Sequence, residues 1–207
     1  MKVIGLGGPP GSGKSAVARE LAMRPGVAWI DLDRVAWHSY RPGTPTFDQL
    51  VSRYGRSILG EDGSIDRQRL ARAAFADAKG RRDLEALVHP AVSAALAQGV
   101  EEHRDAGARI LLVEGALLGV SSAVDYTGID VVLWLDAPPE LRARRLAAAG
   151  RPLHAERWST RAFVTPVRHI RTDGSLEEAV AAVLAAVEDI EPRPSDVNCG
   201  PGSRSPR

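Results

Sequence analysis

The sequence has little cysteine, few aromatic residues and almost no net charge. Its 207 residues include one cysteine, Cys199, so neither a disulfide framework nor a cysteine-based zinc site can be built. Aromatic residues make up 5%, and the core must therefore be largely aliphatic. The formal net charge of +1 argues against binding nucleic acid through a basic surface. Lysine is scarce among the 27 basic residues, with only Lys2, Lys14 and Lys79, which makes each lysine noticeable.

Long apolar runs are also absent. No run reaches the roughly 18 residues that a membrane-spanning helix needs. No basic stretch followed by an apolar segment precedes the first predicted strand, and we expect a cytoplasmic protein. Hydrophobic residues (44%) and charged residues (26%) stand at values typical of a soluble globular chain. A chain of this length suits one α/β domain with inserted segments.

A glycine-rich segment, residues 8–15, is the most informative part of the chain. It reads Gly-Pro-Pro-Gly-Ser-Gly-Lys-Ser and fits the P-loop pattern of Gly, any four residues, Gly, Lys, Ser/Thr. A predicted strand (2–6) precedes it and a predicted helix (16–22) follows, so backbone N–H groups converge on one point. Lys14 would reach the β- and γ-phosphates and the Ser15 hydroxyl would coordinate Mg²⁺. The alternative is a tight strand-to-helix turn with an incidental lysine.

Four further apolar runs predict strands that are covered on both faces. They span residues 27–30, 110–113, 131–135 and, more weakly, 167–170. With the first strand they predict a five-stranded, doubly wound parallel sheet of the P-loop NTPase class. In such a sheet the ligand lies at the carboxyl ends of the strands.

The stretch from residue 32 to 108 is too long for a simple crossover. Helical patterns at 47–59, 66–75, 80–88 and 90–106 are separated by turn signals, and Asp66 is a plausible N-cap. His89 precedes Pro90, a pair that usually marks a helix boundary. We therefore predict an inserted helical substrate-binding region over residues 32–108.

The remaining segments complete a predicted division of the chain. The P-loop core comprises residues 1–31, 109–137 and 162–190, and its last helix (175–188) begins with the capping box Ser175 and Glu178. Residues 138–161 are rich in arginine and suit a phosphoryl-transfer lid, although a solvated amphipathic helix would read the same. Residues 191–207 are rich in Pro, Ser, Gly and Arg, and we expect a disordered tail.

Carboxylates follow two of the predicted strands. Asp31 and Asp33 close the second strand, and they would share one side if the strand continued. Either could serve as a general base for a hydroxyl acceptor, arrange waters around Mg²⁺, or simply cap the next helix. Glu114 ends the third strand in a Walker-B-like position, where it could hold a Mg²⁺-bound water or orient a substrate group.

A series of short motifs besides the P-loop lies along the chain, at 30–33, 41–45, 53–55, 58–59, 62–67, 75–77 and 84–90, and then at 114–118, 136–140, Arg145 and 172–175. In order and spacing these motifs resemble the dephospho-CoA kinase family. The match is dense up to about residue 90 and thinner after it.

The resemblance implies ATP-dependent phosphorylation of the ribose 3′-hydroxyl of dephospho-CoA, the last step of coenzyme A biosynthesis. It implies Asp33 as general base, His89 near the acceptor, and residues 171–174 near the adenine of ATP. The expected ATP-binding residues are Gly8, Gly11, Ser12, Gly13, Lys14, Ser15, Ala16, Arg145, Arg161, Thr172 and Asp173. The expected substrate-binding residues are Asp31, Asp33, Arg34, His89 and Glu114; Lys14 joins Asp33 in catalysis, and Ser15 binds Mg²⁺. We expect a monomer or small homo-oligomer that binds neither nucleic acid nor a membrane.

The chain also departs from the family pattern. Pro9-Pro10 stands where the loop more often has Gly-Ile. An arginine expected after the second strand is replaced by Trp37, and Arg34 or Arg41 could substitute. The lid is shortened, with Arg151 and Arg161 as the nearest replacements for its usual arginine. A nucleoside or nucleoside-monophosphate kinase, or a P-loop binding protein without kinase activity, stays open as an alternative.

Overall fold

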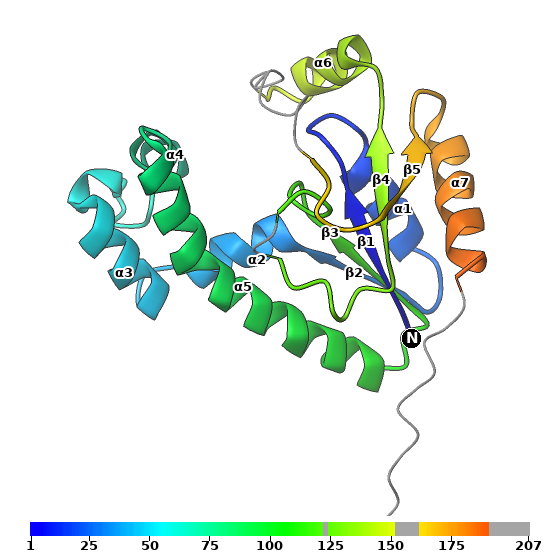
Figure 1. The fold of residues 1–207 in the computed structure, drawn as a ribbon, viewed down its shortest axis with the longest axis horizontal. Helices are drawn as coiled ribbons and strands as arrows, with labels where there is room; N and C mark the ends of the chain where they lie inside the picture. The colour runs from blue at the N-terminus through cyan, green and yellow to red at the C-terminus, as the bar shows by residue number, and fades with distance from the viewer. Residues whose placement is uncertain (122–123, 152–161, 191–207) are drawn as a thin grey trace, which may run out of the picture.

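Five parallel strands form a single sheet in the computed structural model, which describes residues 1–121, 124–151 and 162–190. The order across the sheet is β2-β3-β1-β4-β5 (Figure 1). The strands are β1 (Lys2–Gly7), β2 (Val27–Asp31), β3 (Ile110–Glu114), β4 (Val131–Asp136) and β5 (Val167–Arg171). The predicted fold class is confirmed, and each predicted strand is present with its carboxyl end extended by a residue.

Helices cover both faces of this sheet. On one face, α1 (Lys14–Ala22) and α7 (Leu176–Glu188) pack against β1, β4 and β5 through aliphatic side chains (Figure 1). α7 begins at the predicted capping box, in which Ser175 and Glu178 satisfy each other's backbone N–H groups. On the other face, the second half of α5 (Ala78–Asp105) packs Val92, Leu96 and Val100 on the sheet.

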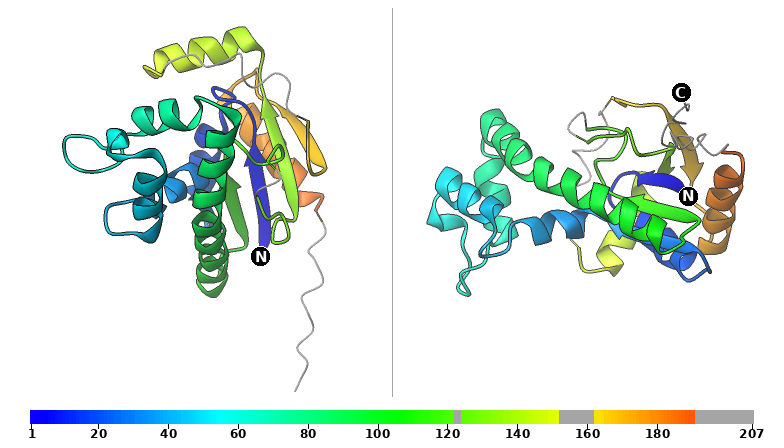
Figure 2. Two further views of the ribbon diagram at one scale, coloured as in Figure 1. Left: turned by 60° about the vertical axis from the view of Figure 1, so that its left-hand side comes forward. Right: turned by 90° about the horizontal axis from the view of Figure 1, so that it is seen from below.

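A separate helical lobe stands beside the carboxyl end of β2 (Figures 1 and 2). It consists of α2 (Leu32–Ser39), α3 (Pro45–Tyr54), the 3₁₀ turn η1 (Arg56–Ile58), α4 (Arg67–Ala74) and the first half of α5. The lobe has its own aliphatic core, formed by Leu50, Ile58, Ile65, Leu70 and Val88. As predicted, α4 is capped by Asp66, whose side chain accepts backbone hydrogen bonds from Gln68 and Arg69.

The prediction of two helices separated at His89-Pro90 is wrong. α5 is one helix of 28 residues, with Pro90 inside it. A proline removes one i→i−4 hydrogen bond and normally kinks or breaks a helix. Here side chains on both sides of Pro90 are packed, Leu84 and Val88 in the lobe and Leu96 on the sheet, so burial outweighs the lost bond. The same helix thus belongs to the predicted insert and serves as the crossover to β3.

The remaining helix, α6 (Pro139–Ala148), stands at the carboxyl end of β4 (Figure 1). It lies in the first part of the predicted lid, residues 138–161. Residues 152–161 of that lid and the predicted tail, residues 191–207, lie outside the described residues. Within the described ranges, no helix combines the length and the apolar character that a bilayer crossing requires.

Candidate active site

The glycine-rich segment forms a turn between β1 and α1 that needs glycine at defined points. Gly13 is the N-cap of α1 with a φ of 92°, a left-handed conformation that favours glycine. Gly8 has a φ of 143°, and a Cβ atom there would lie 2.2 Å from the carbonyl oxygen of Leu135. The turn is therefore fixed by close backbone packing against β4. Within the turn the Ser12 N–H donates to the carbonyl oxygen of Pro9 at 3.2 Å, and the N-terminus of α1 that follows can face an anion.

Lys14 lies over this turn. Its Nζ donates hydrogen bonds to the carbonyl oxygens of Gly8, at 2.8 Å, and Pro9, at 3.1 Å. The side chain is buried, and this burial lowers the pKa of Lys14 to about 8, although Glu114 and Asp33 act in the opposite direction. An ammonium in this position can contact the terminal phosphates of a nucleotide held by the turn.

Ser15, in the first turn of α1, and Glu114, at the carboxyl end of β3, form a hydrogen-bonded pair. The Ser15 hydroxyl donates to Glu114 Oε1 at 2.5 Å. Burial raises the pKa of Glu114, and the hydrogen bond from Ser15 and the charge of Lys14 partly offset that rise. Among the described residues, Oε2 of Glu114 is buried without a hydrogen-bond partner. A hydroxyl beside a carboxylate with an unused oxygen suits Mg²⁺, which is bound through oxygen ligands and retained waters.

The two aspartates at the carboxyl end of β2 differ in position, because the strand ends at Asp31 and α2 begins at Leu32. Asp31 is the N-cap of α2, and its Oδ1 accepts a hydrogen bond from the backbone N–H of Arg34 at 3.1 Å. Asp33 lies in the first turn of α2 and opens into the cleft beside the P-loop. Burial and the negative charge of Asp31 raise the pKa of Asp33, and the positive charges of Lys14, Arg151 and Arg67 partly offset that rise. The helix-cap interpretation is thus correct for Asp31 and leaves Asp33 available for chemistry.

Thr172 and Arg145 join the P-loop to the strands and helix on the other side of the cleft. The buried Thr172 Oγ1 lies 2.7 Å from the carbonyl oxygen of Ser12 and 3.0 Å from that of Asp136. Arg145, on α6, donates from Nη2 to the Thr172 carbonyl oxygen at 2.8 Å. Its Nη1 lies 3.5 Å from the Gly11 carbonyl oxygen, so this guanidinium borders the P-loop.

These groups line one cleft, with a volume of about 700 Å³, which we call the catalytic cleft. Most of the predicted site residues contribute to its walls: Gly11, Gly13, Lys14, Ser15, Ala16, Asp31, Asp33, Glu114, Arg145 and Thr172. Gly8 and Ser12 lie behind the wall, where their carbonyl oxygens hold Lys14 and Thr172.

Other predicted residues are not on these walls. The side chain of Arg34 is not part of the lining, and Asp173 forms an ion pair with Arg171 beyond the cleft. Of the two arginines considered for the shortened lid, Arg151 lines the cleft, and Arg161 lies outside the described residues.

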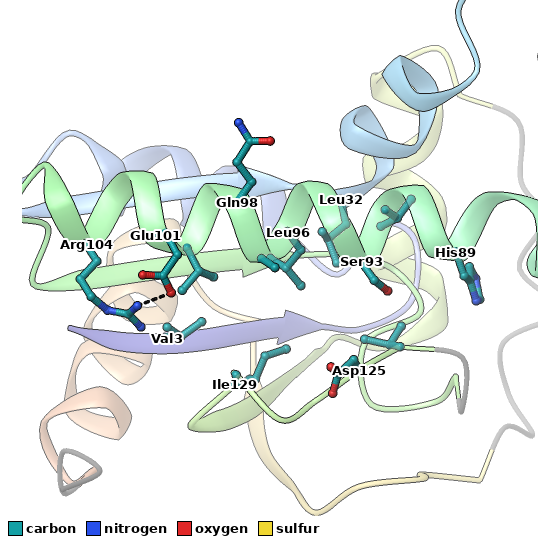
Figure 3. Close-up of a pocket in the computed structure, with 15 residues that line it drawn as sticks. Val3, Leu32, His89, Ser93, Leu96, Gln98, Glu101, Arg104, Asp125 and Ile129 are labelled. Carbon is teal, nitrogen blue, oxygen red and sulfur yellow. Dashed lines mark hydrogen bonds and ion pairs between the residues drawn. The ribbon is translucent and has the colours of Figure 1, made fainter. Parts of the chain in front are cut away.

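His89 lies outside the catalytic cleft, on α5. It borders a hollow of about 240 Å³ between α2, α4 and α5, which we call the lobe hollow. Asp33 also lines this hollow. His89 also borders a hollow of about 440 Å³ on the face of the sheet, between α5 and residues 124–129. Figure 3 shows this second hollow, with His89 at one end, Leu96 and Ile129 facing each other, and Arg104 paired with Glu101 at the other end. Burial lowers the pKa of His89, so its imidazole is neutral at neutral pH.

Trp37 and Arg67 are among the cleft residues that were not predicted as site residues from the sequence. Trp37 lies on α2, one helical turn after Asp33, and Arg67 is the first residue of α4. The guanidinium carbon of Arg67 lies 3.6 Å from the centroid of the Trp37 ring. A signal was present for Trp37, since residues i and i+4 lie on one face of a helix. For Arg67 there was none, because only the tertiary fold brings α4 to the cleft.

The sheet order, the phosphate-binding turn and the cleft with its serine, lysine and carboxylates define a P-loop phosphotransferase. Comparison with known proteins narrows this class. The family model for dephospho-CoA kinase matches residues 2–158. The dephospho-CoA kinase of Symbiobacterium thermophilum is 38% identical over 193 residues, covering 90% of this chain and 80% of the relative. That of Moorella thermoacetica is 34% identical over 199 residues, covering 92% and 93%.

The chain therefore belongs to the dephospho-CoA kinase family. Membership confirms the resemblance and the predicted enzyme class, an ATP-using kinase of coenzyme A biosynthesis. The crystal structure of TT1252 from Thermus thermophilus is similar, with 29% identity and a TM-score of 0.65, covering 90% of this chain and 96% of that one. A dephospho-CoA kinase from Campylobacter jejuni shares the fold at 16% identity and a TM-score of 0.57, covering 91% and 97%.

Proposed function

We propose that this chain transfers the γ-phosphoryl group of ATP to the ribose 3′-hydroxyl of dephospho-CoA, with Asp33 as the general base. One observation carries this assignment: Asp33 shares the wall of one cleft with Lys14 and the Ser15–Glu114 pair. A base on one side and a phosphate-binding turn on the other leave room for an acceptor hydroxyl and a γ-phosphate between them.

The chemical step follows from these groups. The Asp33 carboxylate accepts the proton of the 3′-hydroxyl, and the hydroxyl oxygen bonds to the γ-phosphorus as the bond to the β–γ bridging oxygen breaks. ADP leaves with that oxygen. Lys14 and the N–H groups of the turn stabilise the charge on the phosphate oxygens, which is the main contribution a protein makes to phosphoryl transfer.

Mg²⁺ is the metal that the oxygen donors beside the P-loop fit. The Ser15 hydroxyl would bind it directly, and Glu114 would hold one of its waters through the oxygen that has no partner among the described residues. When bound, the ion neutralises charge on the β- and γ-phosphates. Because the Ser15 hydroxyl donates its proton to Glu114, its oxygen lone pairs would stay available to the ion.

The adenosine of ATP would lie at one end of the catalytic cleft, and dephospho-CoA would extend from Asp33 into the lobe hollow. For ATP, Arg145 and the apolar side chains of Leu146, Leu176 and Ala179 line the end beside α6 and α7, where the adenine would lie. For the acceptor, the lobe hollow opens beside Asp33 and is lined mostly by apolar side chains, with His89 at its wall. A neutral imidazole there can accept or donate a hydrogen bond to the acceptor.

The direct test uses purified protein, MgATP and dephospho-CoA, with mass detection of the product. We expect CoA and ADP in equal amounts. Adenosine and adenosine 5′-phosphate, offered under the same conditions, test the nucleoside and nucleotide kinase alternatives. A faster reaction with either of them, or ATP binding with no acceptor-dependent ADP release, would contradict the proposal. Cytoplasmic location and a monomer or small homo-oligomer stay predictions.

A further inference from the structure

The stacked pair of Trp37 and Arg67 stands at the mouth of the catalytic cleft, on the side of the helical lobe. Trp37 is 41% exposed although it is a large aromatic residue, and it comes from the same helix as Asp33. Arg67 comes from α4, which is brought to α2 by the aliphatic core of the lobe. The guanidinium carbon of Arg67 lies 3.6 Å from the centroid of the Trp37 ring, well within cation–π distance.

The side chain of Arg67 forms no hydrogen bond with the residues that the structure describes. Stacking engages the face of the guanidinium and leaves the N–H donors in its plane available. Within the described ranges, Arg67 has neither a hydrogen bond nor an ion pair with another side chain. Two other arginines do form such hydrogen bonds: Arg69 donates to the Leu59 carbonyl oxygen at 2.5 Å, and Arg145 donates to the Thr172 carbonyl oxygen at 2.8 Å. Arg67 is thus a cation that lines the cleft and is held by Trp37, with no hydrogen-bond or ion-pair partner in the part of the chain that is described.

We propose that Trp37 and Arg67 form the anion-binding element of the acceptor site, in which the indole holds the guanidinium against the diphosphate of dephospho-CoA. This inference rests on the proposed placement of the acceptor at Asp33. The diphosphate of the acceptor is attached to the 5′-carbon of the ribose whose 3′-hydroxyl reacts. A cation that serves it must therefore stand close to the base, and Arg67 acts on both Asp33 and Tyr40 electrostatically.

The location of Arg67 favours the acceptor over ATP. Among the described residues, Lys14 lies within the turn and Arg145, on α6, borders it, whereas Arg151, just after α6, lines the cleft and acts electrostatically on both Lys14 and Asp33. Arg67 belongs to the helical lobe, on the Asp33 side of the cleft. The planar guanidinium of Arg67 can donate two hydrogen bonds to a diphosphate at once. Its contact with Trp37 fixes the orientation of the guanidinium before the ligand binds.

The test compares Arg67→Ala, Arg67→Lys, Trp37→Ala and Trp37→Phe with the wild type. We expect Arg67→Ala to raise the KM for dephospho-CoA by about 10- to 100-fold, the loss typical of a charge-assisted hydrogen bond, with the KM for ATP unchanged. Arg67→Lys should recover only part of this loss, because an ammonium cannot bind in two-point fashion. Trp37→Ala should raise the same KM by about 2- to 5-fold, and Trp37→Phe should restore most of it.

Arg72→Ala is the matched control, since Arg72 is an exposed arginine of the same helix that does not line the cleft. Calorimetric binding of dephospho-CoA without ATP gives a second readout that does not depend on turnover. An unchanged KM for dephospho-CoA in Arg67→Ala, or an equal rise in both KM values, would overturn the inference. An inactive wild type that still binds dephospho-CoA, and loses that binding in Arg67→Ala, would refute the proposed reaction but leave this site standing.

Discussion

Replacing Asp33 with asparagine removes the proposed base while keeping the shape of the side chain. General-base assistance is worth about 10²–10⁴ in rate, so kcat should fall by about that factor, a loss of about 3–5 kcal/mol of transition-state stabilisation. ATP affinity should be kept or increase slightly, because Asp33 lies across the cleft from the phosphate-binding turn and its carboxylate repels a triphosphate. The expected signature is a loss of kcat without a loss of ATP binding.

Asp31→Asn is the matched control for this variant. Asparagine caps helices as well as aspartate does, so the hydrogen bond to the Arg34 N–H is retained and α2 should keep its position. Only the charge of Asp31 is lost, and that charge raises the pKa of Asp33. The base must be ionised to accept a proton, so the rate falls as the pH drops through its pKa. Without Asp31 that pKa is lower, and the acidic limb of the pH–rate profile should move to lower pH with kcat near the wild-type value.

Two measurements on these variants test whether Asp33 is the base. Single-turnover formation of CoA isolates the chemical step from product release, and titration with ATP in the absence of acceptor gives the nucleotide affinity. A near-normal single-turnover rate in Asp33→Asn would refute the assignment of Asp33 as base. An acidic limb that stays in place in Asp31→Asn would refute the electrostatic coupling between the two carboxylates.

Three further predictions follow from the same site and from α5. Glu114→Gln should raise the Mg²⁺ concentration for half-maximal rate by about 10- to 100-fold, because Glu114 orients Ser15, while Ser15→Thr should be nearly neutral in that titration. Because burial lowers the pKa of Lys14 to about 8, ATP binding at a pH above 8 should take up protons, measurable by calorimetry in buffers of different ionisation heat; no uptake would contradict a neutral Lys14. Pro90→Ala should stabilise the protein by up to about 3 kcal/mol in urea unfolding, since alanine restores the missing helical hydrogen bond, and a lower midpoint would refute the view that Pro90 is merely tolerated.

The sheet and the phosphate-binding turn were predictable because their signals are local. Near-continuous aliphatic runs specify strands buried on both faces, and the glycines and Lys14 of the turn act through the backbone beside them. The capping box of α7 is local too, and it stands where the pattern put it.

What the sequence could not supply depends on contacts between distant segments. Proline rules predicted a break at Pro90, but packing in two different cores carries α5 through it. Asp31 and Asp33 were expected to share a side only if β2 continued, and the early start of α2 separates them instead. The approach of Arg67 to Trp37 depends on how α4 packs on the lobe, which no local pattern encodes.

Because α5 is continuous, a small bend at Pro90 would displace the helical lobe relative to the sheet. The helix rises about 1.5 Å per residue, so its start at Ala78 stands about 18 Å from Pro90. At that radius a bend of about 10° at the proline carries the start of the helix, and the lobe packed on it, through about 3 Å. This equals the length of one hydrogen bond. A single backbone position that already lacks its helical bond can thus set whether groups on the lobe reach those on the sheet, with no turn of helix having to unwind.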